Sequence, residues 1–397
     1  MKTLVVNCGS SSLKCRLYDM GEEERVLASG SIERLAEPGC NLSCSAGERS
    51  LREPVDVATH DAALALLSKA MFSLAFDAPD PPRDIGVVGH RVVHGGERFR
   101  AATPIDATVE AAIESLAPLA PVHNPICLLG IRRARELFPN ARHVAVFDTA
   151  FHHTLPERAY LYALPHALYE RDRVRRYGFH GTSHRYAATR AAELLGLGAT
   201  SRLITCHLGA GCSLAAVENG RSIDTSMGMT PLEGLVMATR SGDVDPGIFA
   251  FLTRQRGMSA EEVDALLNRE SGMLGVSGLS GDVRELEAAA AGGNPRAELA
   301  LTLFAYRARK AIGAYLAVLG GADAIVFTGG AGAHATALRQ RILVGLEELG
   351  ILLDPAANAA CTGGEAQISE AASLIALLVV AANEELLIAR EAVAASR

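Results

Sequence analysis

A short loop near the start of the chain combines a glycine, three serines and a lysine, a composition that suits anion binding. It lies in VVNCGSSSLKCRL, between two short runs that are predicted to be strands. Small residues let backbone amides approach an anion, hydroxyl groups add donors, and a lysine adds positive charge. Ser10, Ser12 and Lys14 are therefore candidate phosphate contacts. A tight hairpin without a ligand explains this single loop equally well.

A second segment, residues 202–220, repeats the same plan. It reads RLITCHLGAGCSLAAVENG, which predicts a strand, a small-residue loop, a second strand and a hairpin turn at Asn219-Gly220. Two similar units about 200 residues apart predict an internal duplication with one such loop in each domain. Two loops facing one cleft would hold a polyphosphate from both sides.

The segment VVGHRVVHGG, residues 87–96, could bind a short carboxylic acid. His90 and His94 are four residues apart, as in a helical metal site, but the valines and flanking glycines favour a strand. On a strand Arg91 and Val93 share one face, so a guanidinium for the carboxylate lies beside an apolar surface for the alkyl end. An edge-strand arginine in a surface ion pair is the alternative.

A third glycine cluster favours a different function. In AIVFTGGAGAHATALRQRIL a predicted strand is followed by Gly330-x-Gly332 and a predicted helix, and Asp354 lies 22 residues after Gly332. This spacing imitates a dinucleotide fingerprint, so an NAD-dependent dehydrogenase is a rival hypothesis. The position of the cluster near the C-terminus argues against it. The Walker A pattern GxxxxGK[ST] is absent, which argues against a P-loop NTPase.

Composition narrows the partners and the compartment. A formal net charge of -7, without long runs of Lys or Arg, gives no reason to expect nucleic acid or an anionic membrane as partner. The longest apolar stretch, residues 371–382, is too short for the roughly 20 residues of a membrane span. Eight cysteines without CxxC spacing predict reduced thiols in a cytoplasmic protein, and 397 residues suit two domains.

The elements that must position these residues alternate between β-branched runs and helical segments rich in Ala, Leu and Glu. This pattern predicts an α/β protein with largely parallel sheets. Strands are predicted at residues 4–7, 86–94, 143–147, 203–207, 214–218 and 324–327. A capping box from Ser259 to Glu262 begins a helix that Gly272 is predicted to end. Asn294-Pro295 begins another helix, which Gly320 ends.

Long segments of the chain resemble the acetate kinase family, within the superfamily of acetate and sugar kinases, Hsp70 and actin. The segments are VVNCGSSSLK, GHRVVHGG, FDTAFHHTLP, YGFHGTSH, DTSMGMTPLEGLVMATRSGDVDPG, SGLSGDVRELE and NEELLIARE, in the same order along essentially the whole chain. The resemblance implies two RNase H-like, actin-like ATPase domains with a cleft between them. Residues 1–150 plus 382–397 would form the acid and magnesium side, and residues 151–381 the nucleotide side.

The resemblance also implies reversible, direct in-line phosphoryl transfer from ATP to acetate, giving acetyl phosphate and ADP. Such transfer needs alignment of the reactants and cations around the migrating group. Arg91 and Arg240 would border that group, with His180 as a transition-state stabiliser. Asp148 would be the active-site acid. Because acetate is already ionised at neutral pH, we expect Asp148 to orient the acceptor or a magnesium-bound water, and a helix cap is the alternative for it.

The family positions for magnesium, with manganese as a possible substitute, are Asn7 and Glu384. Without the resemblance, Glu384 would be only a favourable acid in the first turn of a helix. The acid pocket is expected to consist of Val93, Val122, His123, Phe179 and Pro231. Leucine is usual at the position of Val122, so the pocket is expected to be about one methylene wider and to accept propionate as well.

The expected nucleotide contacts come from four segments. They are Ser10, Ser12, Lys14, His207, Leu208, Gly209, Ala210, Gly211, Asp282, Val283, Arg284, Gly330, Ala331, Gly332, Ala333 and His334. Asparagine is common at the position of Ala210, and the family more often has Ile-Gly-Glu-Asn where this chain has residues 330–334. For Asp282 and Arg284 an exposed ion pair at a helix start is the alternative.

The family resemblance therefore implies a phosphotransferase that binds ATP, Mg²⁺ and acetate and forms a homodimer, and the cysteine usage predicts a cytoplasmic protein. Three alternatives stay open at this point. A kinase for propionate or another short-chain acid differs in pocket volume, a dehydrogenase would bind NAD, and a non-catalytic actin-like ATPase would have no acid substrate.

Overall fold

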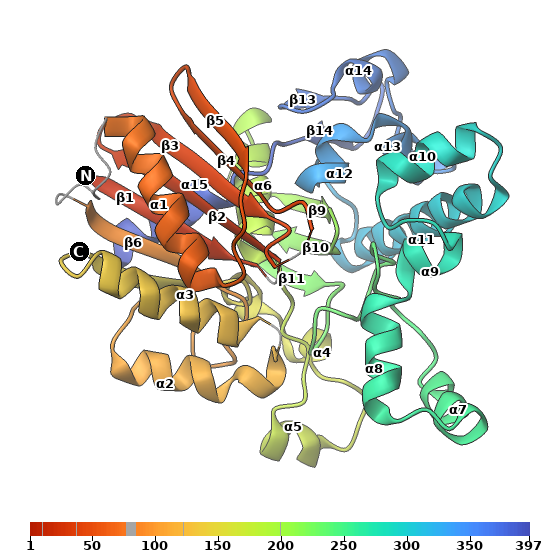
Figure 1. Cartoon of the computed structure of the whole chain (residues 1–397). Helices are drawn as coiled ribbons and strands as arrows, with labels where there is room; N and C mark the ends of the chain where they lie inside the picture. The colour runs from red at the N-terminus through yellow and green to blue at the C-terminus, as the bar shows by residue number, and fades with distance from the viewer. Residues whose placement is uncertain (10, 37, 77–84, 122, 199) are drawn as a thin grey trace. The chain divides into compact units, whose positions relative to one another are not determined.

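The computed structural model describes residues 1–9, 11–36, 38–76, 85–121, 123–198 and 200–397. Contacts among Cα atoms divide the chain into two compact units (Figure 1). The N-terminal unit comprises Met1–Ala150 and Asn383–Arg397, and the C-terminal unit comprises Phe151–Ala382. Among the described residues, no helix is both long and apolar enough to span a bilayer.

The N-terminal unit is built on an eight-stranded mixed sheet in the order β5-β4-β3-β2-β1-β6-β8-β7. Its strands are β1 Lys2–Cys8, β2 Ser12–Met20, β3 Glu24–Glu33, β4 Asn41–Ala46, β5 Arg49–Pro54, β6 Ile85–Val92, β7 Thr103–Pro104 and β8 Arg142–Phe147. Its helices are α1 His60–Phe76, α2 Ala107–Ser115, η1 Ala117–Leu119, α3 Asn124–Leu137 and α15 Glu384–Ala395. The strands β1, β6 and β8 run parallel, while β1 and β2 form an antiparallel pair.

Helices cover both faces of this sheet, so its central strands are apolar on both sides. Leu4 and Val6 of β1 belong to the core that includes residues of α1 and α3, whereas Val5 packs with Ile388 of α15. Gly89 lets α15 approach closely, because a Cβ there would lie 3.0 Å from Ile388 Cγ2. Every second residue of β1, β6 and β8 therefore faces α15.

The C-terminal unit has a six-stranded sheet in the order β11-β10-β9-β12-β14-β13. The strands are β9 Arg202–Leu208, β10 Cys212–Glu218, β11 Arg221–Thr225, β12 Ala324–Thr328, β13 Ala366–Gln367 and β14 Ala376–Val379. The order β11-β10-β9-β12-β14 repeats β3-β2-β1-β6-β8, with the first pairs antiparallel and the rest parallel. The predicted α/β fold with an internal duplication is confirmed in this strand order.

The helices of the C-terminal unit fill the long connections of its sheet. They are η2 Ala150–Thr154, α4 Glu157–Tyr160, α5 His166–Asp172, α6 Gly181–Leu194, α7 Gly247–Arg256, α8 Ala260–Arg269, α9 Gly272–Ser277, α10 Val283–Ala291, α11 Pro295–Leu319, α12 Gly329–His334, α13 Thr336–Leu343, η3 Glu347–Leu349 and α14 Pro355–Ala360. Helix α6 packs on one sheet face through Ala187, Ala188 and Ala191. Small residues on this helix bring it close to the strands.

Most local predictions are confirmed, and one is wrong. The six predicted strands are present with ends within two residues of those expected, and Asn219 and Gly220 have the positive φ angles of 53° and 73° that a tight hairpin requires. The capping box at Ser259 and the cap at Asn294 are present. Gly272 does not end α8, which stops at Arg269. It begins α9 instead, where a Cβ would lie 2.3 Å from the Met237 carbonyl oxygen.

Candidate active site

Three polar side chains of the N-terminal unit lie at the ends of strands, on the same sheet face that α15 covers. Asn7 lies two residues after Val5 on β1, Arg91 two after Gly89 on β6, and Asp148 two after Val146 at the end of β8. Because side chains alternate along strands, all three point to the α15 side at the carboxyl ends of parallel strands. Glu384 is the first residue of α15.

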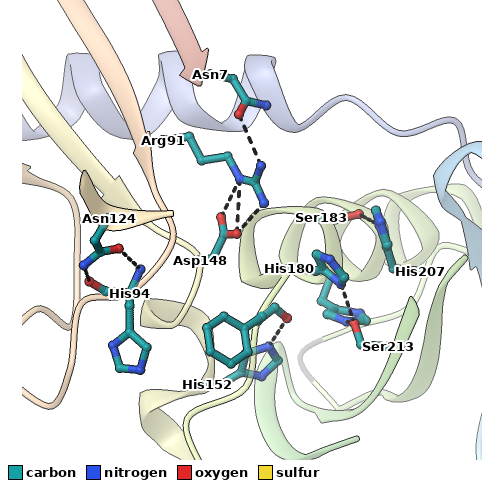
Figure 2. Close-up of polar contacts among 12 residues, drawn as sticks. Asn7, Arg91, His94, Asn124, Asp148, His152, His180, Ser183, His207 and Ser213 are labelled. Carbon is teal, nitrogen blue, oxygen red and sulfur yellow. Dashed lines mark hydrogen bonds and ion pairs between the residues drawn. The ribbon is translucent and has the colours of Figure 1, made fainter. Parts of the chain in front are cut away.

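Arg91 is held by hydrogen bonds on two sides (Figure 2). Its Nε donates to both Asp148 carboxylate oxygens at 2.9 and 3.1 Å, Nη2 donates to Oδ2 at 2.5 Å, and Nη1 donates to Asn7 Oδ1 at 3.2 Å. Burial alone would lower the pKa of Arg91, but the Asp148 carboxylate raises it above its ordinary value. The site therefore contains a fixed guanidinium cation on a central strand, not on a sheet edge.

The oxygen atoms near Arg91 suit a hard divalent cation. Burial raises the pKa of Glu384 to about 7, and the Arg91 cation lowers it in part. The Asn7 amide oxygen and the Glu384 carboxylate are ligand types that Mg²⁺ prefers. No cluster of three or more His, Cys, Asp or Glu side chains with metal-site geometry occurs in the part of the chain that the structure describes. These residues fit a magnesium ion that takes its other ligands from water and phosphate.

The serine-rich loop of the N-terminal unit is short. Gly9 N donates to Ser12 O at 2.7 Å. Strand β2 begins at Ser12, so the predicted contacts Ser12 and Lys14 both lie on it. Lys14 pairs with Asn7 in the strand register and is exposed on the face that contains Asn7. The imidazole Nε2 of His60 lies 2.7 Å from Gly9 O, an anchor that the sequence analysis missed. Ser10 lies outside the described residues.

Part of the predicted acid pocket gathers around Asn124, as Figure 2 shows. The amide N of His94 donates to Asn124 Oδ1, and Asn124 Nδ2 donates to His94 O, both at 3.1 Å. This pair ties Val93, which is buried, to the start of α3 next to His123. Strand β6 ends at Val92, so Val93 lies just beyond the strand that was predicted to include it. Val122 lies outside the described residues.

In the C-terminal unit, predicted catalytic residues meet above the loop between β9 and β10. The His180 ring stacks on His207 with a centroid distance of 4.3 Å. A Cβ on Gly211 would lie 3.3 Å from His180 Nε2 and 3.4 Å from Arg240 Nη1, so both groups lie over this glycine. Arg240 Nη1 donates to Pro231 O at 3.1 Å, and burial lowers the pKa of Arg240.

His180 itself has a strained backbone. Its φ of 56° lies in the left-handed region, which is uncommon for residues other than glycine, and it is the residue before α6. The preceding carbonyl, that of the buried Phe179, lies 2.9 Å from His152 Nε2.

The predicted nucleotide segments at residues 207–211 and 330–334 are neighbours. Gly329 has a φ of 79°, and a Cβ there would lie 2.7 Å from Leu208 O, so the start of α12 packs directly on the end of β9. Backbone groups hold the first loop, since Gly209 N donates to Gly211 O and Ala238 N to Ala210 O. His334 Nδ1 lies 2.6 Å from Thr362 O. Ala331, Gly332 and Ala333 lie within α12.

Asp282 and Asp354, both singled out in the sequence, each cap the start of a helix. Asp282 caps α10 and accepts from Arg284 N at 2.8 Å, and the two side chains form an ion pair at 2.6 Å with Arg284 88% exposed. Val283 begins that helix. Asp354, the acid of the dinucleotide-like pattern, caps α14 by accepting from Ala356 N and Ala357 N. Helix capping therefore explains the aspartate at this position without a dinucleotide site.

Several polar residues behind His180 were missed in the sequence analysis. His184, Ser213 and Thr205 form hydrogen bonds that reach His180. The spacing of His180 and His184, one helical turn apart, is the one signal that could have indicated them. The partners on β9 and β10 depend on strand register, which no local pattern gives.

Comparisons with known proteins show the family of this chain. The acetokinase family matches residues 2–390. This chain belongs to the acetokinase family. It is 51% identical over 393 residues to the acetate kinase of Methanosarcina barkeri, covering 98% of this chain and 96% of that protein. It is 49% identical over 394 residues to an acetate kinase of Clostridium botulinum, covering 98% of each chain.

Two solved kinase structures share the fold over nearly the full length. The Porphyromonas gingivalis acetate kinase is 44% identical, with a TM-score of 0.90 and 100% coverage of both chains. A propionate kinase from Francisella tularensis is 39% identical, with a TM-score of 0.91 and 98% coverage of both chains. The fold is therefore that of the two-domain, actin-like kinases of this family.

Proposed function

We propose that this chain catalyses reversible phosphoryl transfer between ATP and acetate, which gives acetyl phosphate and ADP. The observation that carries the proposal is the Arg91 cation, fixed by Asp148 and Asn7, in a chain of the acetokinase family. A rigid guanidinium can bind carboxylate or phosphoryl oxygens at two points. The apolar Val93 two residues away suits a short alkyl end.

In the proposed step a carboxylate oxygen of acetate attacks the γ-phosphorus of ATP in line, and the bond from that phosphorus to the β,γ-bridging oxygen breaks. The electron pair of the broken bond stays on ADP. Arg91 and Arg240 neutralise charge on the phosphoryl oxygens, and His180 donates a hydrogen bond to them. Asp148 holds Arg91 in place and orients the acceptor, which is ionised and needs no base.

Asn7 and Glu384 are the residues proposed to hold Mg²⁺, or Mn²⁺ in its place. When bound, the cation neutralises charge on the β- and γ-phosphates. Lys14 and Ser12, on the same face of β2, add a cation and a hydroxyl group toward phosphate. The acid pocket is proposed to comprise Val93, Val122, His123, Phe179 and Pro231.

For the nucleotide, the proposed contacts divide by chemistry. Backbone and side-chain groups of His207, Leu208, Gly209, Ala210 and Gly211 would contact phosphate, together with Ser10. The segment Gly330, Ala331, Gly332, Ala333 and His334 would accommodate the nucleoside, with Asp282, Val283 and Arg284 from α10. The close packing of Gly329 on Leu208 supports this assignment, because it makes the two glycine segments one surface.

The test is hydroxylamine trapping of acyl phosphate, with ATP and Mg²⁺ and with acetate, propionate or butyrate as acceptor. We expect strong product with acetate, and a loss of about 100-fold or more in Arg91→Ala. Arg133→Ala is the matched control, since Arg133 of α3 forms surface ion pairs with Asp61 and Glu136. Preference for propionate would favour the activity named for the Francisella tularensis relative. No acyl phosphate from folded wild-type protein would contradict the proposal.

We also propose a cytoplasmic homodimer. All eight cysteines are free and buried, as is usual for proteins of reducing compartments. Helix α7 exposes Ile248, Phe249 and Phe251 at 40%, 45% and 56%, an apolar surface that a second copy could cover. Light scattering after gel filtration should give twice the chain mass, and Phe251→Glu should reduce it. A monomer at micromolar concentration would contradict this assignment.

A further inference from the structure

A line of hydrogen bonds leads from His180 into the interior of the C-terminal unit (Figure 2 shows its first link). His180 Nδ1 lies 2.8 Å from Ser213 Oγ, and the same oxygen lies 2.7 Å from His184 Nε2. His184 Nδ1 lies 2.7 Å from Thr205 Oγ1, which donates to Ala215 O at 3.5 Å. Ser213, His184 and Thr205 are completely buried.

The carbonyl oxygen of Ala215, at the end of this line, determines which atom donates and which accepts in each hydrogen bond. A carbonyl oxygen can only accept, so the Thr205 hydroxyl proton points to Ala215 O and Thr205 Oγ1 accepts from His184 Nδ1–H. A neutral His184 then has a bare Nε2, which accepts the hydroxyl proton of Ser213. The Ser213 hydroxyl group donates its one proton to His184, so its oxygen accepts a hydrogen bond from His180 Nδ1–H.

The direction requires that His184 stays neutral. Burial, together with the neighbouring His152 and His207, holds the pKa of His184 well below its ordinary value. Every link then has one donor and one acceptor. Reversing one link alone would place two donors or two acceptors face to face, and reversing the whole line would take the Thr205 proton away from Ala215 O.

With Nδ1 protonated, the two charge states of His180 differ at Nε2, the atom over Gly211 beside Arg240. A neutral ring has a lone pair there, which repels phosphoryl oxygens. An imidazolium donates from Nε2 and adds positive charge. The Arg240 cation opposes protonation, whereas the Ser213 acceptor favours it. Among the described residues, two further histidines lie beside the ring, His207 stacked at 4.3 Å and His184 at 6.5 Å between ring centroids. Burial raises the pKa of Cys212, the residue after Gly211, to about 12.

We propose that Ser213, His184 and Thr205 are positioning residues that hold His180 in the Nδ1-protonated form and so make its imidazolium the donor to the transferred phosphoryl group. The inference rests on the proposed phosphoryl transfer. It assigns no contact with substrate to the three residues. They act through the tautomer and the protonation of His180.

The test is the pH dependence of kcat/KM for acyl phosphate formation in the full-length protein. We expect activity to fall on the alkaline side as His180 loses its proton. In Ser213→Ala and in Thr205→Val the midpoint of this fall should move down by about 0.5 to 1 pH unit, the effect of one lost hydrogen bond to the charged form. Thr205→Ser, which keeps the hydroxyl group, should restore the wild-type midpoint.

A matched control separates this effect from general damage. Ser222 contacts His152 Nδ1 at 2.7 Å in another buried serine–histidine pair, so Ser222→Ala should leave the midpoint unchanged. Midpoints that stay constant in Ser213→Ala and Thr205→Val, or that shift equally in Ser222→Ala, would overturn the proposal. If wild-type protein forms no acyl phosphate, the proposed function itself fails and takes this inference with it.

A measurement on the wild-type protein tests the proposal even if the variants fail to fold. In protein labelled with [¹⁵N]histidine, long-range nitrogen–proton correlation spectra identify which ring nitrogen of neutral His180 is protonated. We expect Nδ1. Protonation at Nε2 in the neutral ring would overturn the proposal.

Discussion

The absence of a side chain at Gly211 is what lets His180 and Arg240 lie over the same point of the backbone. In Gly211→Ala the new Cβ would lie within 3.4 Å of both, closer than side chains ordinarily tolerate. We expect kcat to fall by about tenfold or more with little change in thermal stability, because small misplacements of catalytic groups are costly. Initial rates and a thermal melt check this.

A neighbouring glycine provides the comparison for that variant. A Cβ on Gly209 would meet only Gly211 O at 3.4 Å and His207 Nε2 at 3.7 Å. Gly209→Ala should therefore reduce kcat distinctly less than Gly211→Ala. Equal effects of the two substitutions would show that the position over His180 and Arg240 is not what matters.

Single residues differ in how far the sequence could predict them. Arg91 and Asp148 stand in segments whose types and strand positions indicate chemistry, and the structure places them in direct contact. Ser213 and Thr205 look like ordinary strand residues in the sequence. Their contacts with His180 and His184 depend on the register of β9 against β10, in which Thr205 pairs with Ala215.

At the scale of elements, a buried arginine joins two short helices of the C-terminal unit. Arg339 of α13 is completely buried and donates to Gly332 O and Ala333 O of α12 and to Asn358 O and Cys361 O around α14. Burial lowers its pKa, and carbonyl oxygens at the ends of these helices take the place of a carboxylate. The predicted nucleoside segment is thereby fixed to α14.

Arg339→Met should leave these carbonyl oxygens without donors. We expect the free energy of unfolding to fall by about 2–4 kcal/mol and the Kd for ATP to rise, as measured by urea denaturation and by calorimetry. Arg341→Met is the control, because Arg341 forms a largely exposed pair with Glu298 and should cost less than about 1 kcal/mol. A stability loss no larger than that of the control would contradict the role of Arg339.

Elements with strong local signals were predictable. The caps at Ser259 and Asn294 and the hairpin at Asn219 follow from side-chain chemistry within a few residues, and all three are present. Gly272 was misassigned because its conformation serves a close backbone approach to Met237, a contact distant in sequence. Asp354 matched a dinucleotide pattern by spacing alone, and its carboxylate caps a helix instead.

At the scale of the whole molecule, the two sheets repeat one strand order and differ in their polar residues. Asn7 and His207 occupy the same position of the first strand in each repeat, where they pair with Lys14 and Ser213. The duplication was predictable because both loops are built from small residues. The sequence did not predict that Arg91 and Asp148 would meet in one unit and that His180 and His207 would stack in the other, because both contacts depend on the fold.

Buried histidines make the whole fold sensitive to acid. Burial lowers the pKa of His152 to about 4, and His90, His143 and His184 also have lowered pKa values. In the unfolded chain these groups titrate near 6.5, so below that pH the unfolded state binds more protons and stability falls as pH falls. For His152 the loss is complete below about pH 4 and is on the order of 3 kcal/mol.

Urea denaturation at pH 7.5, 6 and 5 checks this dependence. Glu384, whose pKa burial raises to about 7, acts in the opposite sense between about pH 7 and pH 4.5. We expect the four histidines to outweigh it, so that the free energy of unfolding decreases over that range, and the decrease to be smaller in His152→Gln. His153→Gln, at an exposed neighbouring position, should keep the wild-type slope. Equal stability of the wild type at pH 7.5 and pH 5 would contradict the burial of neutral histidines.

In the proposed reaction a carboxylate oxygen of acetate attacks the γ-phosphorus of ATP on this chain. The most direct measurement uses [¹⁸O₂]acetate with ATP and Mg²⁺ and follows the products by ³¹P NMR, in which ¹⁸O bonded to phosphorus shifts the resonance. We expect acetyl phosphate in which ¹⁸O bridges the acetyl carbon and phosphorus, formed only when acetate is present. Unlabelled inorganic phosphate, released at the same rate with or without acetate, would contradict it.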